Sequence, residues 1–277
     1  MPRKRWDTIA CCQTYAGRNL TSRETGRAHA SARIAGRVRT ALQALLPQSC
    51  VLCAAASGNA LVCGACGTGM PRLADACPRC ALATPGNVVC GACLATPPPF
   101  DATIAAWRYA FPADRLLQAF KYGGRLALAE PLAAALADAV RARNPRRPDC
   151  LVAMPLAARR QRERGFNHAH EIARRLSASL GIPLVHDLRR TRDAPPQAGL
   201  ALRERTRNVR DAFEARRGLT GRTVAIVDDV MTTGATLRAA AIAVRRAGAI
   251  GVDAWVVART PPPGRDQGSV SATMSLT

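Results

Sequence analysis

Eight of the eleven cysteines stand in four Cys-x-x-Cys pairs, and this spacing constrains the fold more than any other feature of the chain. A first set recurs 27 positions later as a second set, and the pentapeptide VCGAC occurs in both, at 62–66 and 89–93. Two cysteines separated by two residues can turn toward one ion, and two such pairs complete a tetrahedral shell of sulfurs. The repeat predicts two structural zinc sites, formed by Cys50, Cys53, Cys63 and Cys66, and by Cys77, Cys80, Cys90 and Cys93.

Disulfides, redox chemistry and iron–sulfur ligation are the competing uses of such cysteines. Nothing in the chain marks it as secreted, which disfavours disulfides, and a redox Cys-x-x-Cys normally occurs once rather than four times in tandem. Iron–sulfur clusters use the same shell of four sulfurs, so they are an open alternative to zinc. An interleaved pairing of the two cysteine sets is a second open alternative. Cys11, Cys12 and Cys150 stand apart and are interpreted as plain thiols, with Cys150 at the start of a buried strand.

After residue 100 the chain alternates strand-like and helix-like segments. Strands are expected at 103–109, 150–154, 223–227 and 252–257, and helices at about 112–121, 127–142, 167–180 and 235–247. This alternation predicts an α/β fold with a parallel sheet covered on both faces. The predicted organisation is a basic arm at 1–45 with a short amphipathic helix at 30–46, the double zinc ribbon at 46–97, the α/β domain at 98–262 and a disordered tail at 263–277.

The formal net charge of +21 favours a partner that carries phosphate groups. Residues 1–49 hold nine basic residues against two acidic ones, and residues 151–220 hold fifteen against seven. A positive face toward phosphates is therefore expected. An Arg-rich composition also follows from a GC-rich genome. Residues 1–49 fit an unstructured arm or a misassigned translation start better than an organellar presequence. With no run of 18 apolar residues and no secretory signal, a cytoplasmic protein without a membrane span is expected.

The stretch VAIVDDVMTTGATL, residues 224–237, predicts a ligand site. Its pattern is a buried strand ending in Asp228 and Asp229, a loop of small residues, and a helix. In parallel sheets, ligands lie at the carboxyl ends of strands, and loop amides with a helix N-terminus can hold a phosphate. The two acids fit the hydroxyls of a ribose whose 5′-phosphate lies in the loop. The plainer alternative is a strand–turn–helix with solvated acids.

This stretch resembles the phosphoribosyl pyrophosphate (PRPP) motif of type I phosphoribosyltransferases. The resemblance implies the type I phosphoribosyltransferase fold and binding of PRPP with Mg²⁺. It also implies that Asp228 and Asp229 hold the ribose hydroxyls and are the candidate catalytic residues. It also implies a pyrophosphate loop at 152–156. The implied PRPP-binding residues are Val230, Met231, Thr232, Thr233, Gly234, Ala235 and Thr236 in the motif, and Pro155 and Leu156 in the pyrophosphate loop.

Two basic residues outside these loops are further candidates for PRPP binding. Lys121 is the only lysine outside the arm, and a compact ammonium suits a place near the pyrophosphate, although a solvated lysine at a helix end is an equal alternative. Arg164 and Asn167 open a helix next to the predicted pyrophosphate loop, where phosphate contact is expected. His168 and His170 face different ways on that helix, and neither is expected to bind a metal. The aromatic residues between 100 and 122 are interpreted as core in preference to a surface for stacking bases.

The order of motifs resembles the competence protein F family over about residues 46–260. The repeated cysteine unit is followed by FKYGGR (120–125), RGFNHAHEIA (164–173), PPQAGLALRERTRNVRDAF (195–213) and the PRPP motif. The resemblance implies an accessory protein of natural transformation that handles incoming single-stranded DNA with the DNA-uptake machinery. It also implies a mobile flap around Gln197. The alternatives are an active phosphoribosyltransferase acting on a nitrogen base and a non-catalytic PRPP sensor or scaffold.

Overall fold

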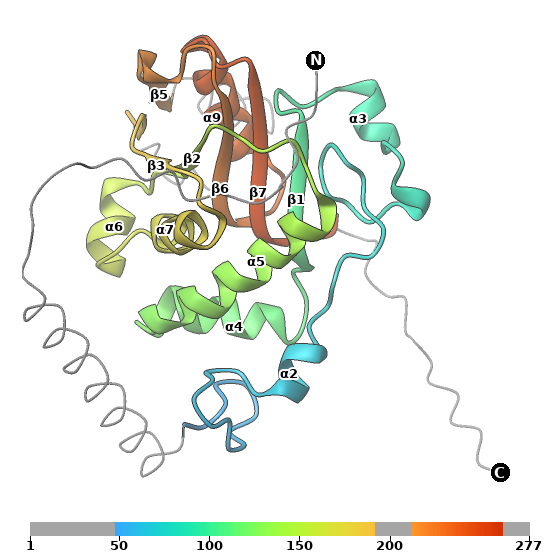
Figure 1. Cartoon of the computed structure of the whole chain (residues 1–277), viewed down its shortest axis with the longest axis vertical. Coiled ribbons are helices and arrows are strands. Elements are labelled where there is room, and N and C mark those ends of the chain that lie inside the picture. The colour runs from blue at the N-terminus through green and yellow to red at the C-terminus, as the bar shows by residue number, and fades with distance from the viewer. Residues whose placement is uncertain (1–47, 192–211, 263–277) are drawn as a thin grey trace, which may run out of the picture. The chain divides into compact units, whose positions relative to one another are not determined.

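The structure, a computed structural model, describes residues 48–191 and 212–262 (Figure 1). The chain divides into two compact units, Met1–Gly69 and Met70–Thr277. Their boundary lies between the two cysteine sets, so the second set belongs to the same unit as the sheet. The predicted amphipathic helix at 30–46, the flap around Gln197 and the tail at 263–277 lie outside the described residues.

The described part of the first unit is rich in loops. Its helix α2 (Gly64–Thr68) begins after Cys63 and buries none of its residues. A β-bridge joins Ser49 to Ala56, and the hydroxyl of Ser57 donates to the carbonyl of Gln48 at 3.0 Å. Because so little apolar surface is buried here, a bound metal is the interaction expected to hold this part together.

Five parallel strands form the central sheet of the second unit (Figure 1). In order across the sheet they are β1 (Ala102–Arg108), β7 (Gly251–Arg259), β6 (Thr223–Met231), β2 (Cys150–Ala153) and β3 (Leu184–Val185). A separate antiparallel pair consists of β4 (Leu188–Arg190) and β5 (Phe213–Ala215). The predicted parallel α/β fold is confirmed, and β6 lies at the centre of its sheet.

Helices connect these strands and pack on the sheet. The main ones are α4 (Ala113–Tyr122), α5 (Ala129–Arg143), α6 (Ala158–Arg164), α7 (His168–Leu180) and α9 (Ala235–Arg246), with a short α3 (Gly91–Ala95) and 3₁₀ turns at Pro85–Asn87, Leu126–Leu128 and Arg217–Leu219. Local sequence sets their ends. Asn167 caps α7 by accepting from the amide of His170 at 3.2 Å, and Gly181 ends it at a φ of 64°. No helix in the described parts of the chain is both long and apolar enough to cross a membrane.

Alternation along β6 separates two buried faces of the sheet. Val224 and Ile226 belong to one core, which includes Leu237 and Val244 of α9. Ala225 is also fully buried but is not part of that core, and α7 packs against β6 and β2 while α5 packs against β1 and β7. This covering of both faces explains why the central strands are continuous apolar runs.

The second cysteine set is joined to the free edge of β1. The amide of Thr103 donates to the carbonyl of Pro78 at 2.9 Å, and its hydroxyl donates to the carbonyl of Arg79 at 2.7 Å. Further along, the amide of Arg108 donates to the carbonyl of Pro71 at 2.8 Å. An exposed edge strand offers unpaired groups to other chains. The segment that carries the second cysteine set, here called the ribbon, therefore covers the edge of β1. It is held there by main-chain hydrogen bonds and by the hydroxyl of Thr103.

Strands β3, β4 and β5 were not among the predicted elements, and two further differences have a clear physical reason. β6 does not end at Val227, because its pairing with β7 continues from Asp228 opposite Val256 to Met231 opposite Arg259. Aspartate disfavours strands intrinsically, and the neighbouring strand overrides that preference. Helix α6 was not predicted, since its sequence ARRQRER has no apolar stripe.

Candidate functional site

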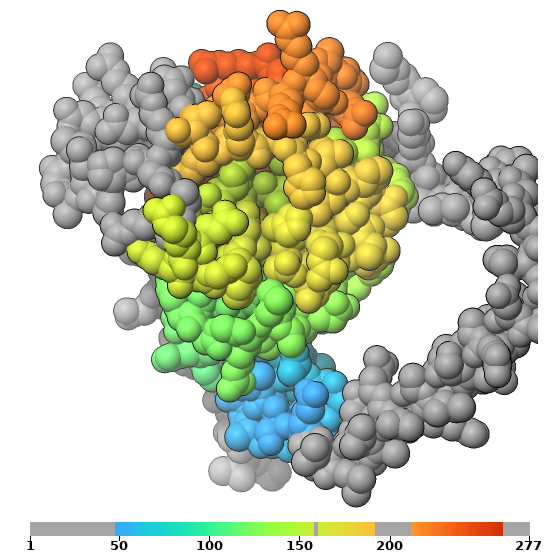
Figure 2. Space-filling model, turned by 90° about the vertical axis from the view of Figure 1, so that its left-hand side faces the viewer, coloured from blue at the N-terminus to red at the C-terminus, as the bar shows by residue number. Residues whose placement is uncertain are grey.

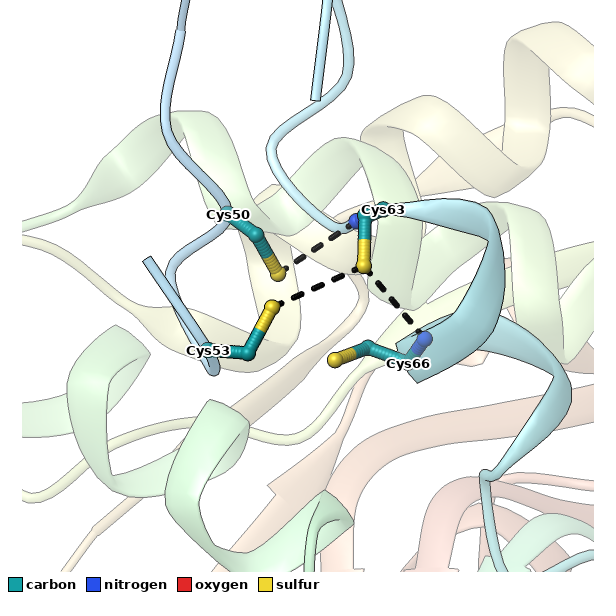
Figure 3. A group of neighbouring side chains, drawn as sticks. All are labelled: Cys50, Cys53, Cys63 and Cys66. Carbon is teal, nitrogen blue, oxygen red and sulfur yellow. Dashed lines mark hydrogen bonds between the residues drawn. The ribbon is translucent and has the colours of Figure 1, made fainter. Parts of the chain in front are cut away.

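The side chains of the first cysteine set, Cys50, Cys53, Cys63 and Cys66, point toward one another (Figure 3). Their sulfurs all lie within 4.8 Å of one another, and the sulfurs of Cys53 and Cys63 are 3.7 Å apart. Sulfurs bound at 2.3 Å around a tetrahedral zinc ion stand about 3.8 Å apart. The amide of Cys63 donates to the sulfur of Cys50 at 3.3 Å, and the amide of Cys66 donates to that of Cys63 at 3.5 Å. This geometry fits a closed four-sulfur metal shell.

Cys77, Cys80, Cys90 and Cys93 form an equivalent cluster in the second unit. The sulfurs of Cys80 and Cys90 are 3.6 Å apart, and the amide of Cys90 donates to the sulfur of Cys77 at 3.3 Å. The two clusters are the sets that the 27-residue repeat predicts, not the interleaved ones. Among the residues that the structure describes, they are the two groups of His, Cys, Asp or Glu able to hold a metal ion.

Backbone amides favour the thiolate at the first cysteine of each set. Burial raises the pKa of Cys50 and Cys77, but amide donors outweigh it and lower the pKa to about 6 and about 7, respectively. Hydrogen bonds with the sulfurs of Cys53 and Cys63 instead raise the pKa of Cys66 to about 12. Without a metal, the four neighbouring sulfurs of a set share protons through hydrogen bonds. A divalent cation replaces these protons and binds all four sulfurs as thiolates. Both sets therefore fit structural zinc.

Asp228 and Asp229 lie near the carboxyl end of β6. Asp229 is 9% exposed, and a carboxylate oxygen of Asp228 accepts from the amide of Asp229 at 2.9 Å. Burial and the adjacent charge of Asp229 raise the pKa of Asp228 to about 8, against the opposing effects of that amide and of Lys121. A carboxylate held in so unfavourable a place is typical of ligand sites.

Lys121 reaches this pair of acids from the last turn of α4. Its ammonium nitrogen lies 3.0 Å from a carboxylate oxygen of Asp229, and the two side chains are 18% and 13% exposed. The helix ends at Gly123, where a Cβ atom would lie 2.6 Å from the carbonyl oxygen of Ala119. Lys121 is therefore not a solvated lysine at a helix end. Its contact with pyrophosphate stays a prediction.

The loop after β6 enters α9 through Gly234. The φ of Gly234 is 78°, a left-handed conformation that favours glycine. The side chains of Thr232, Thr233 and Thr236 are exposed around it, and the amide of Ala235 lies 3.4 Å from the hydroxyl of Thr233. The loop thus presents hydroxyls beside the N-terminus of α9, a combination that suits a phosphate.

The remaining predicted loop residues follow from the strands. Val230 and Met231 are strand residues, and the side chain of Met231 is 3% exposed in the core shared with α9. Pro155 and Leu156 follow β2 and are half-buried. The amide of Met154 donates to the carbonyl of Val227 at 2.9 Å. The two predicted loops therefore start from the carboxyl ends of neighbouring strands.

Arg164 lies at the end of α6 beside the end of α4. One guanidinium nitrogen donates to the hydroxyl of Tyr122 at 3.3 Å, and the guanidinium carbon is 5.1 Å from the centre of that ring. Asn167 has a different role, because its side-chain amide donates to the carbonyl of Met154 at 3.0 Å and so anchors the predicted pyrophosphate loop. Arg164 and Lys121 thus lie at adjacent helix ends, and of the two Lys121 contacts the acids.

Sequence reasoning missed the surroundings of His168. This side chain is 2% exposed and lies edge-on to Phe120, with 4.9 Å between ring centres, and 4.5 Å from the ring of Phe166. Burial lowers the pKa of His168, so it is held neutral. His170 lies instead beside His186 at 5.2 Å, so the two histidines face different ways as predicted.

Arg259, the last residue of β7, was also missed. It is 6% exposed and donates to the carbonyls of Cys80 and Met231, both at 2.9 Å. An arginine that ends the apolar strand VDAWVVAR, parallel to the strand of the motif, was the available signal.

Two family models match the chain. The double zinc ribbon domain matches residues 41–94, and the phosphoribosyl transferase domain matches residues 162–267. The chain is therefore a protein of the class that joins a double zinc ribbon to a phosphoribosyl transferase domain.

Curated relatives narrow this class. Competence protein F of Haemophilus influenzae is 32% identical over 170 residues, which are 58% of this chain and 74% of that protein. DNA utilization protein YhgH of Escherichia coli K12 is 34% identical over 172 residues, 60% of this chain and 76% of that protein. The chain belongs to the competence protein F family. A solved glutamine PRPP amidotransferase from B. subtilis, complexed with ADP and GMP, is 20% identical with a TM-score of 0.36, over 50% of this chain and 30% of that one.

Removing one cysteine is expected to remove one metal ion. The intact protein should carry two zinc ions, and Cys66→Ser and Cys93→Ser one each, because each set forms its own shell. Plasma mass spectrometry of the purified chains measures this content. Cys150→Ser, which changes a buried thiol outside both sets, is the matched control and should keep both ions. Iron in place of zinc, or loss of both ions from one substitution, would contradict the assignment.

Asp228→Asn is expected to stabilise the ligand-free protein at alkaline pH. The folded pKa of about 8 lies above the ordinary value, so the unfolded chain loses this proton first and stability falls as pH rises from about 4 to 8. Asparagine removes that penalty, which should raise Tm at pH 8 by a few degrees, about 1–2 kcal/mol, with no gain at pH 4. Scanning calorimetry at both pH values tests this, with Asp138→Asn on the exposed side of α5 as control. Equal Tm values at pH 8 would refute it.

Proposed function

We propose that this chain binds PRPP with Mg²⁺ at the carboxyl ends of β6 and β2, and that it handles incoming single-stranded DNA in natural transformation. One arrangement supports the ligand above all others. The half-buried Asp228 and the buried Asp229 precede a hydroxyl-rich loop at the N-terminus of α9, and Lys121 contacts Asp229 at 3.0 Å. The names of the relatives, competence protein F and DNA utilization protein, support the biological role.

In this proposal each part of PRPP meets a matching group. Asp228 and Asp229 accept hydrogen bonds from the ribose hydroxyls, and the loop amides at 232–236 with the N-terminus of α9 hold the 5′-phosphate. Lys121 neutralises Asp229 in the free protein. When the ribose hydroxyls take over that acid, the ammonium can turn to the pyrophosphate, which leads from the ribose toward the loop at 152–156.

Mg²⁺ fits this site as part of the ligand. Magnesium is usually held by one or two carboxylates together with the phosphates of a substrate, not by a protein cage. In residues 48–191 and 212–262, no group of three or more carboxylates or histidines gathers at this end of the sheet, while Asp228 and Asp229 do lie there. The pyrophosphate is therefore the expected carrier of the ion.

For single-stranded DNA, the proposal uses the surface formed by the ends of α4 and α6, which lie side by side in Figure 2. Tyr122 is 73% exposed with the guanidinium of Arg164 over its ring, and Arg160 and Arg162 are exposed on α6. Phe100, Trp107 and Phe120 are core residues as predicted, but the core prediction is wrong for Phe111 and Tyr122, which are 76% and 73% exposed. The exposed ring of Tyr122 can stack with a base. We place this activity in the cytoplasm, where the DNA-uptake machinery would deliver the strand.

Catalysis is a second candidate, favoured by the match to a phosphoribosyl transferase domain. A base nitrogen would form a bond to C1 of the ribose while the C1–O bond to pyrophosphate breaks, helped by positioning and charge stabilisation. Base-dependent release of pyrophosphate would identify it. Binding of PRPP without release would identify a regulatory ligand or a sensor.

An Asp228→Asn/Asp229→Asn double variant is expected to lose PRPP binding. Each acid is proposed to accept from a ribose hydroxyl, and such charge-assisted bonds together amount to about 100-fold or more in Kd. Calorimetric titration of Mg²⁺–PRPP into the zinc-loaded protein measures the difference. Asp253→Asn is the control, since this acid lies on β7 in the same sheet and burial likewise raises its pKa, to about 7, but it is no part of the site. A folded wild type that does not bind PRPP would refute the proposal.

Tyr122→Ala is expected to weaken single-stranded DNA binding by about 5- to 100-fold, the usual loss for one stacked base. Fluorescence anisotropy with a labelled oligonucleotide measures it across a range of salt concentrations, because phosphate contacts make binding fall steeply with salt. Phe111→Ala is the matched control, since Phe111 is 76% exposed but precedes the opposite end of α4. Equal losses from both substitutions would argue against a specific stacking site.

A further inference from the structure

Arg259 connects the second cysteine set to the start of the phosphate loop. Its Nε donates to the carbonyl of Cys80 at 2.9 Å. Its Nη1 donates to the carbonyls of Met231, at 2.9 Å, and Thr232, and to that of Thr260 at 2.7 Å. One side chain thus holds the turn between two metal-binding cysteines and the first residues of the loop.

Among its described neighbours, Arg259 forms hydrogen bonds with carbonyl oxygens and not an ion pair. We call its connection between Cys80 and residues 231–232 the Arg259 clamp. The side chain is 6% exposed, and the hydrogen-bond acceptors that the described residues offer it are carbonyl oxygens. A buried guanidinium is costly unless its donors are satisfied by well-placed acceptors. The acceptors must therefore stay in place, and they belong to both segments.

The geometry of the sheet fixes the distance that this clamp spans. Met231 lies opposite Arg259 in the pairing of β6 with β7, and the amide of Thr260 donates to the carbonyl of Met231 at 3.0 Å. On its other side β7 pairs with β1, where Arg108 lies opposite Arg259. The ribbon is itself held to β1 through Thr103. The Cys80 turn is therefore hydrogen-bonded to the sheet at two places, through Thr103 on β1 and through Arg259 on β7.

We propose that the second cysteine set, through Arg259 as a positioning residue, holds the phosphate loop in its binding conformation, so that metal at this set supports PRPP binding without touching PRPP. The inference rests on the proposed function of the loop. Zinc at this set would fix the Cys80 turn, and Arg259 would carry that order to residues 231 and 232. The first cysteine set has no part in it.

The test compares equivalent cysteines of the two repeats in the full-length, zinc-loaded protein. Cys93→Ser opens the second shell but keeps the Cys80 carbonyl, and Cys66→Ser opens the first shell at the same repeat position. Cys93→Ser is expected to raise the Kd for Mg²⁺–PRPP by about 5- to 30-fold, the upper part of the range for a residue that acts through a network. Cys66→Ser should change it less than twofold, about the scatter of the titration.

Arg259→Met and Arg259→Lys test the connection itself. Both should weaken PRPP binding to a similar extent while keeping two zinc ions, since neither changes a cysteine and lysine cannot reproduce the fork of donors. If the metal acts through Arg259, the Arg259→Met/Cys93→Ser double variant should bind no more weakly than the worse single variant. Additive losses, or equal losses from Cys66→Ser and Cys93→Ser, would overturn the inference.

Amide hydrogen exchange of residues 231–236 gives a readout independent of the ligand. Exchange there should speed up in Arg259→Lys and in Cys93→Ser but not in Cys66→Ser. If the wild type binds no PRPP, the proposed function fails, and the exchange data still decide whether the clamp exists. Unchanged exchange in Arg259→Lys and Cys93→Ser would reject the clamp even if PRPP binds.

Discussion

The parallel pairing of β6 with β7 continues past Asp228 and Asp229 to Met231 and Arg259, and the candidate site depends on it. Because the acids are strand residues, their carboxylates are held by the sheet and cannot relax into solvent as loop acids would. The cost appears in the raised pKa of Asp228. Only a short loop then remains before α9, so the acids and the helix N-terminus stay within reach of one small ligand.

Local spacing in the sequence was enough to predict the cysteine sets and a loop of small residues between a strand and α9. In both, the chemistry lies within a few consecutive residues, so a pattern such as Cys-x-x-Cys or Thr-Thr-Gly-Ala-Thr already fixes which atoms can meet. The same holds for the strands and helices with clear periodicity. Helix α6 was not predicted because polar residues lie on all its sides. The end of β6 was not predicted because its pairing depends on β7.

Contacts between distant segments could not be predicted in the same way. Lys121 was a candidate because lysine is rare in this chain. Its ion pair with Asp229 could not be predicted, because it depends on where α4 ends over the sheet. The bond from Arg259 to Cys80 joins residues 179 positions apart and requires the register of β1, β7 and the ribbon together. The two cysteine repeats show the same limit. Their sequences are alike, yet Thr103 and Arg259 hold the second to the sheet, which no pattern within the repeat reveals.

Lysine at position 121, in a chain whose one other lysine is Lys4, fits the ribose site proposed above. An arginine facing Asp229 could form two parallel hydrogen bonds with the carboxylate, and that pair would compete with a ribose for the same oxygens. The ammonium makes one contact, at 3.0 Å, on a flexible stem. It forms one ion pair with the buried acid in the free protein and can leave when hydroxyls arrive. An ammonium group therefore suits a residue that neutralises an acid and then releases it better than a guanidinium group does.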